Sequence, residues 1–207
     1  KDFPLLAKFL DAALPLSIQV HPNDEYAHTH ESATGFHGKT EAWYILEATP
    51  GASVLYGLNA PVSKSDFADA IATDTVEPLF YRLQVEAGDV VFVPAGTLHA
   101  IDAGITLFEI QQKSDLTYRV YDYGRRDART GQLRDLHIEK ALAVSDLTPA
   151  AYHTIPPLPL DEQRVLLVAC PYFALERWSV RKPYRATTSS GSFEILTVIR
   201  GNVVLKW

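Results

Sequence analysis

Short apolar segments, separated by Gly and Pro turns, recur along the chain and constrain its fold more than any other feature. They follow one another at spacings of roughly 8 to 12 residues, which is typical of β-sandwiches and jelly rolls. We therefore predict a mainly β protein with a few short helices. The expected strands are residues 16–20, 42–48, 53–58, 80–85, 90–93, 98–101, 106–111, 115–121, 165–169, 173–180 and 193–199.

Three helices are expected among these strands. Residues 3–12 place apolar side chains at a nearly helical spacing, and Pro15 ends that pattern. Ser63 opens an S-x-x-D capping box, which predicts a short helix over residues 63–71. Residues 136–144 form the third expected helix.

One long polar stretch, residues 24–40, contains three histidines. It has no apolar period, and its glycines add to the irregular pattern. We therefore predict a mobile surface loop. None of His28, His30 and His37 is expected to be a permanent metal ligand.

An internal repeat with an offset of 150 residues relates the two ends of the chain. Its pattern is an aromatic residue, an apolar pair, a turn glycine and a second apolar pair. Weak self-similarity of this kind predicts two β-barrels of one type. We assign residues 1–150 to a first barrel with short helical segments, and residues 151–207 to a Pro-rich linker and the start of an incomplete second barrel. The matched residues are Trp43, Ile45, Leu46, Gly51, Val54 and Leu55 in the first copy and Phe193, Ile195, Leu196, Gly201, Val204 and Leu205 in the second.

Composition and charge limit the partners. The hydrophobic share of 47% is ample for a packed core. With a net charge of -6 and no basic tract, neither nucleic acid nor a membrane is an expected partner. The single cysteine, Cys170, excludes an internal disulfide and fits a reducing compartment, so we expect a cytoplasmic protein. The sequence has no methionine and ends within a strand-like segment, so we expect the native protein to extend beyond both ends.

Three of the predicted strands carry polar groups that could bind a metal. Gln19 and His21 are two residues apart, so on a strand both side chains leave one face. Glu41 opens the apolar run 42–46, and His99 follows another strand. Each residue alone is more often a hydrogen-bonded or surface group, but together they favour one metal site. Two imidazoles and a carboxylate suit zinc, iron, manganese or nickel, and the amide oxygen would be a fourth ligand.

Two basic residues accompany this set. Arg119 lies on a predicted strand between tyrosines, where the paired N–H donors of its guanidinium group could bind a phosphate, a carboxylate or a developing alkoxide. An ion pair with Asp115 or Asp122 is an equally good interpretation. Lys39 stands two residues before Glu41 and shares its face if the strand begins there.

Four stretches form an ordered set along the chain: residues 16–22 (LSIQVHP), 38–44 (GKTEAWY), 94–100 (PAGTLHA) and 118–125 (YRVYDYGR). Together they resemble the type I mannose-6-phosphate isomerases, most closely the short bacterial form. The resemblance implies a cupin fold with a metal barrel, a second barrel and a helical insertion. Residues 58–80 leave room for only a reduced version of the insertion found in the long form. Ile101 stands where longer members have a tyrosine, so the role of that tyrosine is not transferred.

The resemblance also implies an activity and a site. The activity is the zinc-dependent interconversion of mannose 6-phosphate and fructose 6-phosphate through an enediol. Gly191 occupies the repeat position of Glu41, so we expect one zinc ion per chain. The implied metal ligands are Gln19, His21, Glu41 and His99, the catalytic residues are Arg119 and Lys39, and the substrate-binding residues are Ser17, Lys8, Glu109 and Asp115.

The helical spacing of residues 3–12 alone would place Lys8 in solvent. The resemblance instead implies that Lys8 lies in the active site. The expected partner is a small-molecule sugar phosphate, and the expected assembly is a monomer or a weak homo-oligomer. Three alternatives remain open: another metal-dependent cupin enzyme such as an oxygenase, a non-catalytic sugar-phosphate-binding cupin, and a purely structural zinc site.

Overall fold

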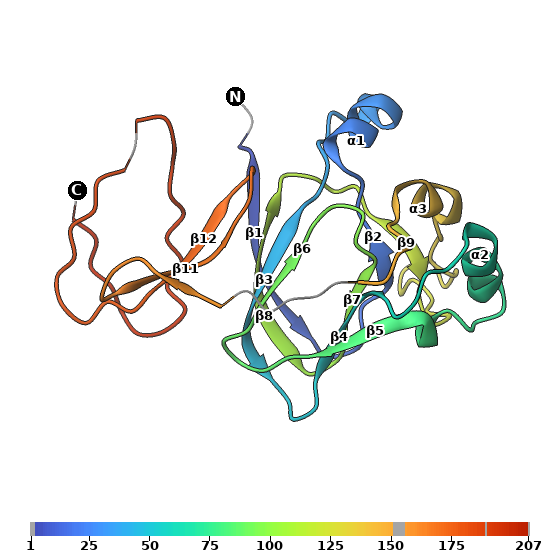
Figure 1. Ribbon diagram of the computed structural model, residues 1–207, viewed down its shortest axis with the longest axis horizontal. Helices are drawn as coiled ribbons and strands as arrows, with labels where there is room; N and C mark the ends of the chain where they lie inside the picture. The colour runs from blue at the N-terminus through green and yellow to red at the C-terminus, as the bar shows by residue number, and fades with distance from the viewer. Residues whose placement is uncertain (1–2, 151–155, 189, 207) are drawn as a thin grey trace.

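Two antiparallel sheets form the larger part of the computed structural model, which describes residues 3–150, 156–188 and 190–206 (Figure 1). Turn residues keep the strands short, and the sheets face one another across a shared core. The four-stranded sheet has the order β1 (Leu5–Ala12), β8 (Ile105–Gln112), β3 (Glu41–Ala48), β6 (Val90–Val93). The five-stranded sheet has the order β5 (Phe80–Gln84), β4 (Ser53–Leu58), β7 (His99–Ile101), β2 (Ile18–Val20), β9 (Tyr118–Tyr121).

The outer faces of both sheets are covered as well (Figure 1). Helices α2 (Lys64–Ala72) and α3 (Ile138–Val144) pack on the five-stranded sheet, where Phe67 and Ala141 join its apolar side chains. A third sheet, β10 (Leu158–Pro159), β11 (Arg164–Ala169) and β12 (Ala174–Trp178), contributes Val168 to an apolar cluster with Phe108 of β8. The mainly β prediction is thus confirmed.

Residues 3–12 do not form the predicted helix, because Leu5–Ala12 is strand β1 at the edge of the four-stranded sheet. Leu10 packs into the core between the sheets, while Leu5 and Ala7 pack against the cluster shared with the third sheet. A strand that is covered on both faces has apolar residues on both. These residues do not alternate with polar ones, so their spacing resembled that of a helix.

The predicted surface loop, residues 24–40, contains helix α1 (Asp24–His30) and a 3₁₀ helix, η1 (Ser32–Thr34). Asn23 caps α1 by accepting a hydrogen bond from the Tyr26 backbone N–H. Acidic residues in the first turn and histidines in the last turn match the helix dipole. These end signals were present in the sequence, but a helix of two turns shows little apolar periodicity.

Other predicted elements agree with the structure to within a few residues. Ser63 caps α2 through a 3.1 Å hydrogen bond from the Asp66 backbone N–H, as the capping box predicted. A second 3₁₀ helix, η2 (Glu77–Leu79), leads into β5. No described helix has both the length and the apolar character needed to cross a membrane.

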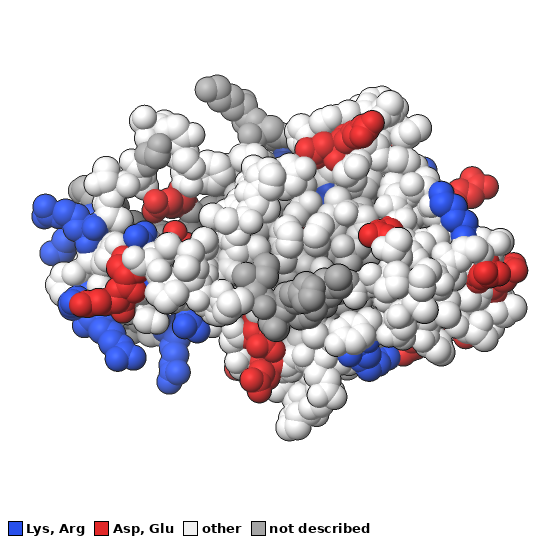
Figure 2. All heavy atoms as spheres, viewed as in Figure 1, with Lys and Arg blue, Asp and Glu red and all other residues white. Residues whose placement is uncertain are grey.

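The C-terminal segment departs from the prediction. Residues 193–199 form no strand, and their apolar side chains are largely exposed, with Leu196 at 56%. A strand needs a hydrogen-bonded neighbour, and within the described part of the chain none lies beside this segment. Figure 2 shows Lys and Arg side chains gathered over this C-terminal part, at the left of the view. Part of the predicted linker, residues 151–155, lies outside the described residues, and the two-barrel division stays a prediction.

Candidate metal centre

His21, Glu41 and His99 converge in the interior between the two sheets. Each offers a ligand atom, and these atoms lie within 4.8 Å of one another. All three side chains are buried, each residue being 1% exposed. His21 directly follows β2, Glu41 begins β3 and His99 begins β7, so three different strands supply the cluster. The three residues could together hold a metal ion.

Strand register explains why these residues meet. Gln19 of β2 is paired directly with His99 of β7, so both side chains leave the same face of the five-stranded sheet. On the opposite sheet, Glu41 is paired with Val93 and Gln111. Val93 belongs to the core between the sheets, which shows that this face of β3 points inward.

Both histidines present the same ring nitrogen to the cluster. His21 Nδ1 lies 2.9 Å from the Leu116 carbonyl oxygen, and His99 Nδ1 lies 2.8 Å from that of Thr97. A carbonyl oxygen can only accept, so each Nδ1 carries the proton and donates. The lone pair of each Nε2 therefore faces Glu41, at 3.5 Å for His21 and 3.4 Å for His99. This is the usual orientation of histidines that bind metals.

The charges of the cluster also suit a cation. Burial lowers the pKa of His99 to about 3, and burial together with the charge of Lys39 lowers the pKa of His21. Burial opposes ionisation of Glu41, but the charge of Lys39 is the largest influence that holds the pKa of this carboxyl well below its usual range. At neutral pH the site therefore contains neutral imidazoles and a carboxylate, the protonation states that a metal requires.

Lys39 places a positive charge among these donors. Its Nζ lies 2.9 Å from His21 Nε2 and 2.9 Å from Glu41 Oε2. Glu41 Oε2 is nonetheless buried without a hydrogen bond of acceptable geometry. The donor set thus already accommodates one cation, the ammonium group, and it retains a carboxylate oxygen for which a metal ion is a fitting partner.

Gln19 and Trp43 complete the surroundings of these donors. Gln19 Nε2 lies 3.3 Å from His99 Nε2, and a half-turn of the amide would present its oxygen instead. The Trp43 indole N–H donates to Glu41 Oε1 at 3.1 Å, and Trp43 is completely buried. Sequence reasoning missed this role of Trp43. Its position two residues after Glu41 on the same strand face was the available signal.

A second buried polar group lies on the same inner face. Lys8 of β1 is paired directly with Glu109 of β8, and its Nζ donates to the Glu109 carboxylate at 2.9 Å. Lys8 also donates to Gln111, a fully buried residue that sequence reasoning missed. Burial and the negative charge of Glu41 raise the pKa of Glu109. Glu109 is therefore easier to protonate than an ordinary carboxylate.

The remaining predicted site residues differ in placement. Arg119 of β9 is paired with Gln19 of β2, so it lies on the inner face, and its Nη1 donates to the Asp135 carbonyl at 2.9 Å. Ser17 is buried just before β2, but within the described residues it makes no hydrogen bond to the cluster. Asp115 is exposed and lies outside the cluster.

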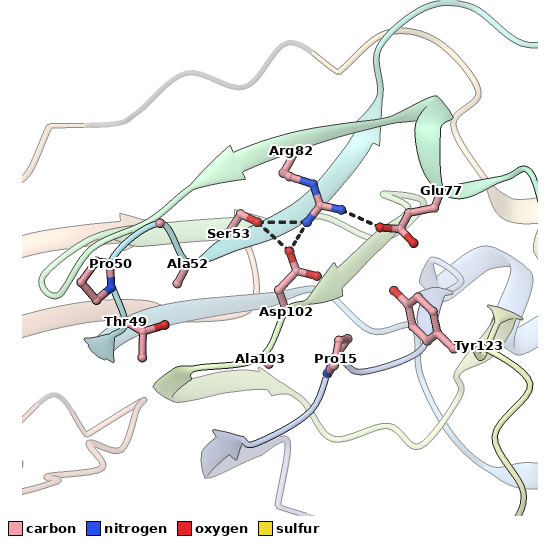
Figure 3. Close-up of a pocket in the computed structure, with 11 residues that line it drawn as sticks. Pro15, Thr49, Pro50, Ala52, Ser53, Glu77, Arg82, Asp102, Ala103 and Tyr123 are labelled. Atoms are coloured by element: carbon pink, nitrogen blue, oxygen red, sulfur yellow. Dashed lines mark hydrogen bonds and ion pairs between the residues drawn. The ribbon is translucent and has the colours of Figure 1, made fainter.

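A cavity of about 470 Å³ lies apart from this centre, and none of the predicted site residues lines it (Figure 3). Arg82 bridges two carboxylates there, contacting Glu77 Oε1 at 2.6 Å and also Asp102. Ser53 donates to Asp102 Oδ2 at 2.6 Å. These side chains satisfy one another, so we interpret the network as a tie between strands β4 and β5 and the end of β7.

Comparisons with known proteins show what this chain is similar to. The family model described as "Phosphomannose isomerase type I, catalytic domain" matches residues 1–48, which include Gln19, His21 and Glu41. The curated "Mannose-6-phosphate isomerase ManA" of Bacillus subtilis is 41% identical over 201 residues. That alignment covers 96% of this chain but 62% of the relative, so the chain spans less than two thirds of its length.

Solved structures give the same result for the fold. A crystal structure of the mannose 6-phosphate isomerase from Bacillus subtilis matches with a TM-score of 0.77 and 38% identity, over 85% of this chain and 55% of that one. The cupin fold expected from the resemblance is thereby confirmed. A mannose 6-phosphate isomerase bound with zinc and yttrium shares the fold at 17% identity and a TM-score of 0.63, over 84% and 63% of the two chains. In sequence and fold, the chain is thus similar to the type I phosphomannose isomerases.

Proposed function

We propose that the protein interconverts mannose 6-phosphate and fructose 6-phosphate, with one zinc ion bound at the cluster of His21, Glu41 and His99. The observation that carries this proposal is that both histidines and the carboxylate are buried in their metal-binding protonation states, with Lys39 in contact. The similarity to the curated and solved mannose-6-phosphate isomerases supports the reaction. The zinc named for a structure of the same fold supports the metal.

We assign the metal ligands to His21, Glu41, His99 and the amide oxygen of Gln19. Two imidazoles and a carboxylate form a common zinc site, and the weaker amide ligand leaves the metal open to exchange with substrate oxygens. Gly191 stands at the repeat position of Glu41, so we expect no second zinc in the C-terminal segment.

The reaction moves a proton between C1 and C2 of the open-chain sugar through an enediol. Bound zinc would supply Lewis-acid polarisation of the sugar oxygens. We assign Lys39 to proton transfer, because its ammonium group already reaches the ligand set. Glu109 would accept hydrogen bonds from sugar hydroxyls, with its carboxylate oriented by the hydrogen bond from Lys8.

The other assigned residues would bind the sugar phosphate or stabilise the negative charge of the enediolate. Arg119 has a buried Nε with no hydrogen-bond partner among the described residues, so it keeps a donor for the phosphate or for the charge on the enediolate. Lys8, Ser17 and the exposed Asp115 would contribute to binding the sugar phosphate. Binding energy from the remote phosphate can then position the reacting carbons.

The test is a coupled assay of the full-length protein with mannose 6-phosphate. We expect turnover with zinc, loss of turnover after chelation, and recovery when zinc is restored. Metal analysis should give one zinc per chain. Stoichiometric iron with oxygen uptake would identify an oxygenase instead, and the absence of turnover at saturating zinc would favour a non-catalytic sugar-phosphate-binding protein.

Replacing Trp43 by phenylalanine should weaken zinc binding by about 10–100-fold, because Glu41 loses the N–H group that orients its carboxylate. Zinc titration against a competing chelator measures the effect. Trp178→Phe is a matched control, since Trp178 donates in the same way to Glu176, two residues earlier on β12. Equal zinc affinity for both variants would contradict the role of Trp43.

A further inference from the structure

Asp122 directly follows β9 and forms ion pairs with Arg125 and Arg134, which lie in the segment after it. Its side chain is 5% exposed. Arg134 binds it with a two-bond fork, donating from Nε to Oδ2 at 2.6 Å and from Nη2 to Oδ1. Arg125 donates from Nε to Oδ1 at 3.1 Å. A planar fork fixes both distance and orientation, so Arg134 is anchored to the end of β9.

The residues after Arg134 run beside Arg119. The Asp135 carbonyl accepts a hydrogen bond from Arg119 Nη1 at 2.9 Å. The His137 backbone N–H donates to the Arg119 carbonyl at 2.8 Å, and His137 Nδ1 accepts from the Arg119 backbone N–H at 3.1 Å. The fork at Arg134 therefore fixes the same short segment that contacts the guanidinium and the backbone of Arg119.

Charge gives a second reason for Asp122 to be present. Burial and the neighbouring charge of Arg134 lower the pKa of Arg119, whereas Asp122 acts to raise it. Burial opposes ionisation of Asp122, but Arg134 and Arg125 hold its pKa below the ordinary value. Asp122 thus neutralises part of the positive charge around Arg119, whose Nε keeps no partner among the described residues.

We propose that Asp122 and Arg134 are positioning residues for Arg119. The fork between them holds residues 134–137 so that the Asp135 carbonyl sets the orientation of the Arg119 guanidinium, leaving its Nε free for an anionic group of the substrate. This inference rests on the substrate-facing role proposed for Arg119. Neither Asp122 nor Arg134 needs to touch the sugar phosphate.

The kinetic test uses single and double variants of the full-length protein. Arg134→Ala should lower kcat/KM by about 10²-fold, a loss typical of a misplaced catalytic group. Arg134→Lys keeps the charge but not the fork, so it should recover only part of this loss. In an Arg119→Ala background, Arg134→Ala should cause no further fall, because it acts through Arg119. Arg126→Ala, which removes a hydrogen bond to Gly131 in the same segment, is the matched control with unchanged activity.

A structural readout separates this inference from the proposed reaction. In the wild-type protein, the Arg119 Nε–H should give a single slowly exchanging NMR signal. This signal should broaden and exchange faster in Arg134→Ala, or in Arg134→Lys if the alanine variant fails to fold. Multiplicative kinetic losses in the double variant, or an unchanged Arg119 signal, would overturn the inference. Absence of isomerase activity in the wild type would refute the proposed function alone, since the NMR comparison needs no turnover.

Discussion

Replacing His99 by alanine should abolish stoichiometric zinc binding and, with it, isomerase activity. His99 supplies one of only two imidazoles in the cluster, and its Nε2 faces both Glu41 and Gln19. Loss of a direct ligand should cost more than the roughly 10–100-fold in affinity that loss of a supporting partner costs. Metal analysis after dialysis and the coupled assay measure the two effects.

His30→Ala is the matched control, because His30 lies exposed at the end of α1 and outside the cluster. This control should keep one zinc per chain and full activity. Thermal unfolding of both variants in excess chelator would show whether the His99 variant keeps its fold. A folded His99→Ala protein that still binds one zinc with wild-type affinity would contradict the assignment.

Replacing Arg119 by alanine should reduce kcat by about 10²–10³-fold while leaving zinc bound. This magnitude is typical for the loss of one preorganised donor to developing charge. In the part of the chain that the structure describes, Arg119 bonds to Asp135 and His137 and forms no hydrogen bond or ion pair with the cluster, so the metal content should not change. The coupled assay and metal analysis of the same preparation measure both quantities.

Arg119→Lys provides the comparison for this prediction. Lysine keeps the charge but lacks the planar fork, so only part of the activity should return. Full activity in Arg119→Ala would refute the assigned role. Loss of zinc from this variant would instead show that Arg119 supports the metal site.

Most of the strands could be predicted from the sequence because glycine and proline turns separate them. Two errors have physical causes. Leu5–Ala12 has apolar residues on both faces because two different cores cover it. Residues 193–199 have strand-like composition, but composition cannot show whether a partner strand lies beside them.

The site was harder to predict from the sequence than the strands were. Spacing alone placed Gln19 and His21 on one strand face, whereas the meeting with His99 depends on register between β2 and β7. Lys8 shows the same limit, because a helical interpretation put it in solvent, while its pairing with Glu109 emerges only across β1 and β8. The family resemblance supplied the remaining assignments.

The central proposal is that His21, Glu41 and His99 form a zinc centre in this protein. Anomalous diffraction at the zinc absorption edge, from crystals of assay-active protein, tests it most directly. We predict a single peak per chain at about 2.0–2.2 Å from His21 Nε2, His99 Nε2 and a Glu41 carboxylate oxygen. A peak at any other group of residues, with none at this cluster, would contradict the claim.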